Sequence, residues 1–249
     1  MYNPFSLEGK TVLVTGASSG IGAETAVECS RLGANVIITG RNEQRLQETF
    51  SRLDSSLTHG HQMVRADLTD ETEVIGLIEQ IGQIDGLVSN AGVNRIKPIA
   101  FIQEDDFDFV FRNNYYASLG LVRFLLKKKR FNRNSSIVFT SSVSALFNAP
   151  GRALYASSKA ALSSLMRSVA VELAEKGIRA NAVLPGLVET KLAHESLTED
   201  ERDKALLEYP LKRFGKPEEI AWAIIYLLSD ASSWVTGASL IVDGGFMLK

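Results

Sequence analysis

The fold of this sequence is decided near its start, by Thr15-Gly16-Ala17-Ser18-Ser19-Gly20-Ile21-Gly22. The stretch follows the apolar, strand-like residues 10–15 (KTVLVT) and precedes the helical pattern of residues 23–32. Glycine lets the backbone turn sharply and approach a ligand, and a helix N-terminus offers unpaired N–H groups and a positive dipole end. The pattern G-x-x-x-G-x-G therefore predicts a phosphate-binding turn, with a plain structural turn as the alternative.

Outward from this turn, short β-branched runs alternate with helical patterns along the whole chain. We expect strands at residues 10–15, 35–39, 62–66, 86–89, 136–141, 179–184 and 239–242. Several of these runs are continuously apolar, which indicates strands covered on both faces, and the helices between them indicate a parallel sheet. The prediction is one doubly wound α/β domain over residues 1–249, with ligands beyond the carboxyl ends of the strands.

The composition excludes several other classes of protein. The net charge of −2 gives no basic field for nucleic acid or an anionic membrane. The one cysteine, Cys29, excludes an intramolecular disulfide and is expected to be a buried thiol. His59, His61 and His194 are too scattered to predict a metal site. No signal peptide is recognisable and no apolar stretch approaches the ~18 residues of a membrane span, so a cytoplasmic protein is expected.

Further motifs follow the later strands in a fixed order. They are Asn90-Ala91-Gly92, Ser142, Tyr155-Ala156-Ser157-Ser158-Lys159, Pro185-Gly186, Val235-Thr236-Gly237-Ala238 and Asp243-Gly244-Gly245. In this order, from Leu7 to Gly245, the motifs resemble the short-chain dehydrogenase/reductase family. The resemblance implies an NAD(P)-dependent oxidoreductase with a Rossmann-type sheet of seven parallel strands, in the order 3-2-1-4-5-6-7, with helices on both faces.

The resemblance also implies a catalytic set of asparagine, serine, tyrosine and lysine. Tyr155 and Lys159 match the last two, Ser142 is preferred to Ser141, and Asn114 is preferred to the neighbouring Asn113. Carbonyl reduction needs a hydride and a proton, and a tyrosine with a pKa near ~10 is a usable acid. Lys159 lies one helical turn further on, and its charge is expected to lower that pKa.

In the same set, the Ser142 hydroxyl would hydrogen-bond the substrate oxygen, and Asn114 would order a water that relays protons to Lys159.

Cofactor contacts are likewise implied by the resemblance. They fall on Gly16, Ser18, Ser19, Gly20, Ile21 and Gly22 for the phosphates, Asp67 and Leu68 for the adenine, Asn90, Ala91 and Gly92 for the adenosine side, Tyr155 and Lys159, and Pro185, Gly186, Val188 and Thr190 around the nicotinamide. Asp67 has the alternative role of a helix N-cap.

One residue bears on the choice of cofactor. NAD-selective members carry an acidic residue at the end of the second strand, where this sequence has Gly40 followed by Arg41. A guanidinium suits a 2′-phosphate, so NADP(H) is expected. NAD(H), with Arg41 as a solvated surface charge, is the alternative.

The leading function is therefore an NADP(H)-linked reductase of a small-molecule ketone. The alternatives are an NAD(H)-linked dehydrogenase of a sugar or secondary alcohol, and a cofactor-binding regulator without turnover. Intact Ser142, Tyr155 and Lys159 argue against the regulator. The substrate and the favoured direction are not specified by the sequence, and the charged residues 191–217 resemble the family's lid over the substrate.

Within the family the chain most resembles 3-oxoacyl-acyl-carrier-protein reductases, notably at residues 210–219 (PLKRFGKPEE). That likeness implies a carrier-bound acyl substrate and basic docking residues beside the site. The candidates are Lys127-Lys128-Lys129-Arg130, Arg133 and Lys176, for which preference for basic residues at helix C-termini is the alternative.

Assembly is a further expectation. The helix expected at residues 155–176 carries the small residues Ala156, Ala160, Ala161 and Ser164, which permit close helix approach. The family resemblance implies that this helix pairs with its two-fold mate in a homotetramer, with ordinary packing on the sheet as the alternative.

Overall fold

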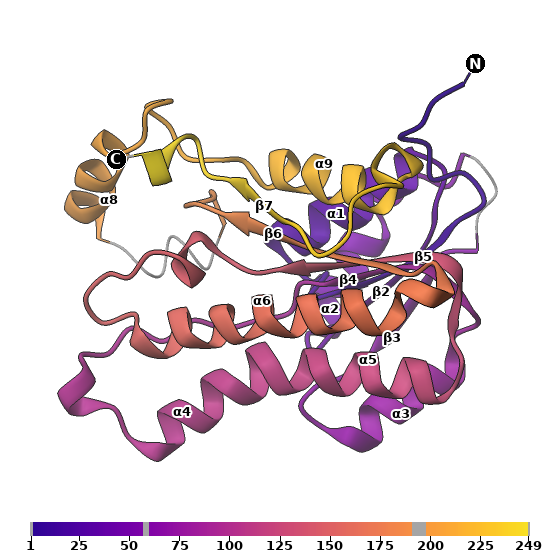
Figure 1. Ribbon diagram of the computed structural model, residues 1–249, viewed down its shortest axis with the longest axis horizontal. Coiled ribbons are helices and arrows are strands. Elements are labelled where there is room, and N and C mark those ends of the chain that lie inside the picture. The colour runs from indigo at the N-terminus through magenta and orange to yellow at the C-terminus, as the bar shows by residue number, and fades with distance from the viewer. Residues whose placement is uncertain (1, 57–59, 191–197, 249) are drawn as a thin grey trace.

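Seven parallel strands form the sheet, in the order β3-β2-β1-β4-β5-β6-β7 (Figure 1). The computed structural model describes residues 2–56, 60–190 and 198–248. The strands are β1 (Thr11–Thr15), β2 (Asn35–Gly40), β3 (Gln62–Arg65), β4 (Ile84–Ser89), β5 (Phe131–Thr140), β6 (Arg179–Pro185) and β7 (Ser239–Val242). The predicted fold class and strand order are confirmed.

Two layers of helices cover the sheet (Figure 1). One layer contains α1 (Gly20–Arg31), α2 (Glu43–Phe50) and α9 (Pro217–Leu228), and the other contains α3 (Glu71–Gln80), α4 (Glu104–Phe111), α5 (Ala117–Lys127) and α6 (Ala153–Leu173). Within β1, Val12 and Val14 face the first layer and Leu13 faces the second, which explains why the strand is continuously apolar. Cys29 is fully buried in the first layer, as expected.

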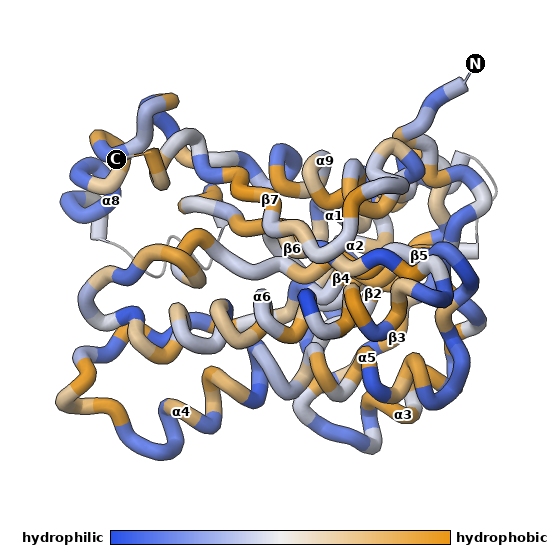
Figure 2. Tube along the Cα trace, in the orientation of Figure 1, coloured by the Kyte–Doolittle hydropathy of each residue, from blue (hydrophilic) through white to orange (hydrophobic). Residues whose placement is uncertain are grey.

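Hydropathy separates the sheet from the periphery. In Figure 2 hydrophobic colouring runs along the strands between the helix layers, whereas α8 (Glu199–Leu207), outside them, is largely hydrophilic. The sheet and its two facing helix layers therefore form the core, and α8 lies at its edge.

Two predicted boundaries need correction. β5 begins at Phe131 rather than at residue 136, because residues 132–136 (NRNSS) are polar and hide the strand from a hydrophobic pattern. Asn114 lies in a π-helical turn (Arg112–Tyr116) between α4 and α5. The tyrosine helix, α6, begins two residues before Tyr155 and ends at Leu173.

Two kinds of feature are missing from the described residues. None of their helices is long and apolar enough to cross a bilayer. They also contain no group of three or more His, Cys, Asp or Glu side chains that could hold a metal ion. His61 accepts a hydrogen bond from the Val36 N–H at 3.1 Å, and His59 and His194 lie outside the described residues.

A buried threonine hydroxyl joins β1 to the loop after β4. Thr15 Oγ1 donates to the Val88 carbonyl at 3.2 Å and accepts from the N–H groups of Asn90 (2.9 Å) and Ala91 (3.1 Å). Thr15 is 0% exposed, so these two N–H groups have no water to replace the hydroxyl. The Thr15 hydroxyl thus holds two neighbouring strand ends in place where the site forms.

We expect Thr15→Val to lower the free energy of unfolding by about 2–4 kcal/mol, because it leaves two buried donors without an acceptor. Thr39→Val is the matched control. Thr39 pairs with Thr15 in the neighbouring strand and is equally buried, but its hydroxyl has no hydrogen-bond partner. The control should change stability by less than about 0.5 kcal/mol or raise it. Equal losses in urea denaturation of the two variants would contradict this account.

Candidate active site

A cavity of about 890 Å³ lies beyond the carboxyl ends of the strands. It runs from the glycine turn after β1 to the ends of β5 and β6. Every residue that the sequence predicts for the site lines this cavity except Gly22 and Asn114. Gly22 packs behind the glycine turn and Asn114 lies buried behind the wall at Val93. The fold therefore brings together residues spread from Gly16 to Thr190.

The glycine turn has no room for side chains. A Cβ on Gly16, whose φ is +63°, would lie 2.9 Å from Ala91 Cα, and a Cβ on Gly22 would lie 2.4 Å from the Gly16 carbonyl oxygen. Ser19 is the N-cap of α1, but its side chain makes no capping hydrogen bond. The first N–H groups of α1 are thus not capped by a side chain, and the cradle fits a diphosphate group.

Ser142, Tyr155 and Lys159 meet at the opposite end of the cavity. Ser142 caps a short 3₁₀ turn, and its Oγ accepts from the Ser144 N–H at 3.1 Å. Tyr155 and Lys159 lie one turn apart on α6, with Lys159 Nζ 5.7 Å from the centre of the tyrosine ring. Lys159 Nζ also donates to the Thr140 carbonyl at 2.8 Å, which fixes the ammonium beneath the end of β5.

Burial controls the protonation of both α6 residues. Burial raises the pKa of Tyr155 above its ordinary value, and a hydrogen bond from Ser142 and the charge of Arg152 only partly oppose this. The lowered tyrosine pKa that the sequence predicts is therefore not found, because burial dominates, and the charge that opposes burial is that of Arg152. Burial also lowers the pKa of Lys159 to about 8. At neutral pH, Tyr155 keeps its proton and most Lys159 side chains are charged.

The two adjacent asparagines serve different neighbours. Asn114 Oδ1 accepts from the Val93 N–H at 2.7 Å, and its Nδ2 donates to the Val93 carbonyl (3.0 Å) and to Ser158 Oγ (2.9 Å). A Cβ on Gly92 would lie 3.1 Å from Asn114 Oδ1 and 3.4 Å from Lys159 Nζ. The glycine therefore keeps open the space beside both groups.

Asn113 was not predicted as a site residue. Its Nδ2 donates to the Phe109 carbonyl at 2.8 Å, which turns its Oδ1 toward Arg41 Nη1 at 3.3 Å. The π-helical turn lets one asparagine reach Arg41 on the cavity wall and the next reach Val93 behind it, and a sequence pattern based on a regular helix does not reveal this.

Arg41 lies on the cavity wall beside Asp67. Its Nη1 is 3.9 Å from Asp67 Oδ2, and the arginine side chain is 53% exposed. Burial tends to raise the pKa of Asp67, but hydrogen bonds from Thr69 and the charge of Arg41 outweigh it and lower the pKa. The alternative role of Asp67 as a helix cap is wrong, because Asp70 caps α3. Both charged residues are thus available at the adenosine end.

The expected lid is only partly described. Residues 191–197 lie outside the described residues. After them, α8 contributes Ala205 to the cavity wall, and Glu208 and Tyr209 follow. Tyr209 is 2% exposed, and its hydroxyl accepts from the Leu187 N–H at 2.8 Å. This ties the segment after α8 to the loop that follows β6.

The basic residues that the sequence suggests for carrier docking lie at the amino edge of the sheet, away from the cavity. Residues 127–130 join α5 to the start of β5, and the Arg130 carbonyl accepts from the Ile84 N–H at the start of β4. Lys176 likewise precedes the start of β6. Figure 1 shows the α5–β5 connection at the opposite side of the molecule from α8. A helix that ends before a strand must end at the amino edge, whereas the cavity is at the carboxyl edge.

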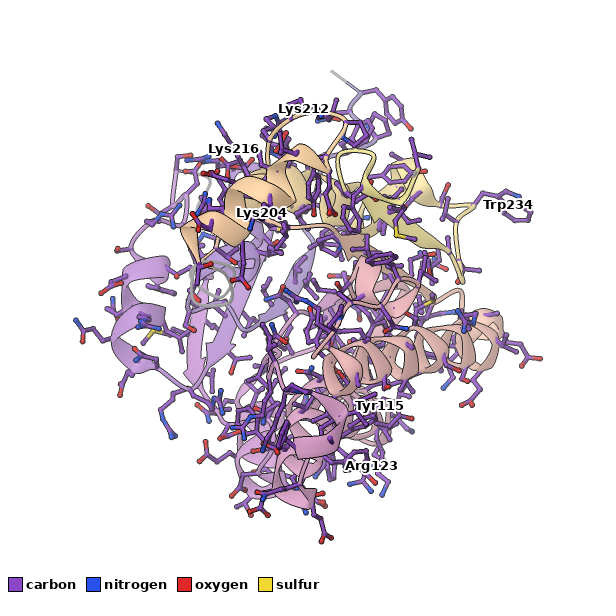
Figure 3. All side chains as sticks on the ribbon, turned by 90° about the vertical axis from the view of Figure 1, so that its left-hand side faces the viewer. Tyr115, Arg123, Lys204, Lys212, Lys216 and Trp234 are labelled. Atoms are coloured by element: carbon purple, nitrogen blue, oxygen red, sulfur yellow. The ribbon has the colours of Figure 1, made fainter. Side chains whose placement is uncertain are left out.

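The cavity end has basic residues of its own. Figure 3 looks at this end and shows Lys204, Lys212 and Lys216 around α8 and the start of α9. Acidic residues of α8, among them Asp200 and Glu201, lie on the same helix as Lys204. This surface is therefore mixed in charge rather than a basic patch.

Comparison with known proteins gives consistent matches over almost the whole chain. A family model described as enoyl-(acyl carrier protein) reductase matches residues 16–247. The chain is 37% identical over 246 residues to a 3-oxoacyl-[acyl-carrier-protein] reductase of Thermotoga maritima, covering 97% of this chain and 99% of that protein. It is 35% identical over 249 residues to an L-rhamnose 1-dehydrogenase (NAD(P)(+)) of Sphingomonas, covering 98% of both.

Solved structures likewise match almost the whole chain. A short-chain type dehydrogenase/reductase from Mycobacterium marinum matches with a TM-score of 0.90 and 31% identity, covering 99% of this chain and 98% of that one.

Proposed function

Because this chain belongs to the short-chain dehydrogenase/reductase family, we propose that it transfers hydride between NADP(H) and the carbonyl carbon of a ketone, or the matching secondary alcohol. The observation that carries the proposal is that Ser142, Tyr155 and Lys159 line the same cavity as the glycine turn. When bound, the nicotinamide supplies the hydride. A cofactor-binding regulator would have no physical need for these three groups around one point.

Tyr155, Ser142 and Lys159 each have a separate role in the rest of the reduction. The Tyr155 hydroxyl donates the proton to the carbonyl oxygen, a role that its raised pKa suits at neutral pH. The Ser142 hydroxyl donates a hydrogen bond to the same oxygen as negative charge develops there. The Lys159 ammonium then stabilises the tyrosinate that is left. In the oxidation direction the same tyrosine accepts the alcohol proton.

The proton that Tyr155 donates would be replaced through the space beside Gly92. Asn114 Oδ1 uses one acceptor position for Val93 and retains a second for a water molecule. That water would lie within reach of Lys159 Nζ, since both groups border the Cβ position that Gly92 leaves empty. Asn114 is thus proposed to relay protons through Lys159 rather than to touch the substrate.

The proposed preference for NADP(H) rests on the adenosine end. Arg41 follows Gly40 at the end of β2, where a carboxylate would be needed to accept from a ribose hydroxyl. Its contact with Asp67 is long and exposed, so the guanidinium is not held in a strong pair. Asn113 Oδ1 helps to orient it toward the cavity. A guanidinium oriented in this way favours a 2′-phosphate.

Two other substrate classes are supported by relatives. Matches to 3-oxoacyl-carrier reductases and to L-rhamnose dehydrogenases differ little in identity, so they do not separate the classes. A 3-oxoacyl group on acyl carrier protein, compared with the same group on a short thiol, tests the first. A carrier-independent kcat/KM would argue against it.

We also propose a cytoplasmic homotetramer, although the cytoplasmic location rests on the sequence alone. On α6, Ala160 and Ser164 are exposed and available to a second copy, whereas Ala156 is buried within the chain. Light scattering at micromolar concentration measures the mass, and a monomer would contradict the proposal.

We expect Tyr155→Phe to reduce turnover of a confirmed ketone by at least ~10²-fold, because it removes the proton donor. The dissociation constant for NADPH should be unchanged, because the ring remains in place. Tyr116→Phe is the control, since Tyr116 is 64% exposed and does not line the cavity. Near-full activity of Tyr155→Phe would show that the catalytic assignment is wrong.

We expect Arg41→Ala to weaken NADPH binding by about tenfold to hundredfold, the scale of a lost charge-assisted hydrogen bond, with little change for NADH. Fluorescence titration measures both constants. Arg65→Ala is the control, because Arg65 pairs with Glu73 outside the cavity. Tighter binding of NADH than of NADPH by the unmodified protein would refute the preference.

A further inference from the structure

On the substrate side of the cavity, Arg152 is a cation with no partner among the residues that the structure describes. It lines the cavity with Ser142 and Tyr155 and stands at the N-cap of α6, three residues before the tyrosine. Its guanidinium makes no ion pair or hydrogen bond with another residue in the described parts of the chain. Its neighbour on the same wall, Glu208, does not lie within ion-pair distance of it.

Three other arginines near this end of the molecule form ion pairs. Arg95 pairs with the buried carboxylate of Asp106 and stacks over Phe109. Arg202 pairs with Glu189, and Arg213 pairs with Glu219. Within the described residues, the fold therefore supplies counter-charges for these three arginines but none for the arginine beside the reacting groups.

The charge of Arg152 acts on a tyrosine on each of two sides of the cavity. Burial raises the pKa of both Tyr155 and Tyr209, and the charge of Arg152 partly opposes that rise at each of them. Tyr155 lies on α6 and Tyr209 follows α8, so the guanidinium faces the space between these two walls. A substrate whose carbonyl oxygen meets Tyr155 would occupy this space.

The side chains around the Arg152 guanidinium do little to replace its lost hydration. Phe147, Phe246 and Tyr209 form an aromatic wall, with ring centres 5.3 Å apart for Phe147 and Phe246 and 5.1 Å apart for Tyr209 and Phe246. Ser144 and Asn148 add two neutral polar groups to the same part of the cavity. A cation in a partly apolar cavity loses hydration, and that cost is recovered when an anion binds.

We propose that Arg152 binds a carboxylate of the substrate, so that the enzyme acts on a keto acid or the matching hydroxy acid. This rests on the proposed function, because it places the acid beside the carbonyl that Tyr155 protonates. A planar guanidinium donates to both oxygens of a carboxylate at once and so also fixes the orientation of the carbonyl. A neutral thioester or sugar offers this guanidinium hydrogen-bond acceptors but no counter-charge, and the proposal separates the keto acids from both.

The test compares each acid with its neutral ester. With NADPH, kcat/KM is measured for 3-oxobutanoate and 4-oxopentanoate and for their methyl esters. We expect at least one acid to be preferred to its ester by tenfold or more. In Arg152→Met that ratio should fall by about tenfold to hundredfold, the scale of one charge-assisted pair. Arg152→Lys should keep part of the ratio. Arg167→Met, an exposed position on the same helix, should leave it unchanged.

Binding is measured separately, so that a failure of the proposed chemistry can be recognised. Calorimetry with 3-hydroxybutanoate, in the presence of NADP⁺, should give a dissociation constant at least tenfold weaker in Arg152→Met than in the unmodified protein. If no ketone is reduced but this difference is found, the proposed function fails and the carboxylate site stands. An acid-to-ester ratio and an affinity that Arg152→Met leaves unchanged, with thermal melts confirming folding, would overturn the inference.

Discussion

The hydrogen bond from Lys159 Nζ to the Thr140 carbonyl ties α6 to the end of β5 at 2.8 Å. An ammonium that is 4% exposed needs such a partner, and burial still lowers its pKa to about 8. Together with the apolar packing of α6 on the sheet, this bond places Tyr155 relative to Ser142, two residues beyond Thr140. The position of the catalytic groups therefore depends in part on how one charge is buried.

The cavity is charged differently at its two ends. At the adenosine end, Arg41 has exposed partners in Asp67 and Asn113, which orient it but leave it available. At the substrate end, Arg152 has no partner among the described residues. Between them, the glycine turn presents backbone N–H groups rather than side chains. On the proposed function, one arginine selects the cofactor and the other selects the substrate.

Much of this arrangement could be predicted from the sequence, because apolar runs mark buried strands and glycines mark the phosphate turn. What could not be predicted depends on how deeply a side chain is buried and on which neighbours it faces. The start of β5 is polar and was missed. The rise in the Tyr155 pKa follows from burial, which a spacing of four residues does not reveal. The role of Asn113 depends on a π-helical turn, and that of Arg152 on its lack of a partner among the described residues, which only a three-dimensional arrangement shows.

The central claim is that reduction uses a tyrosine that keeps its proton beside a lysine that loses its charge just above neutral pH. Its most direct test is kcat for ketone reduction at saturating NADPH, from about pH 6 to about pH 10. Burial depresses the pKa of Lys159 to about 8, so its charge is present below that pH and lost above it. The account predicts a plateau at neutral pH and a fall above about pH 8. A rate that rises with pH, or stays flat to about pH 10, would contradict it.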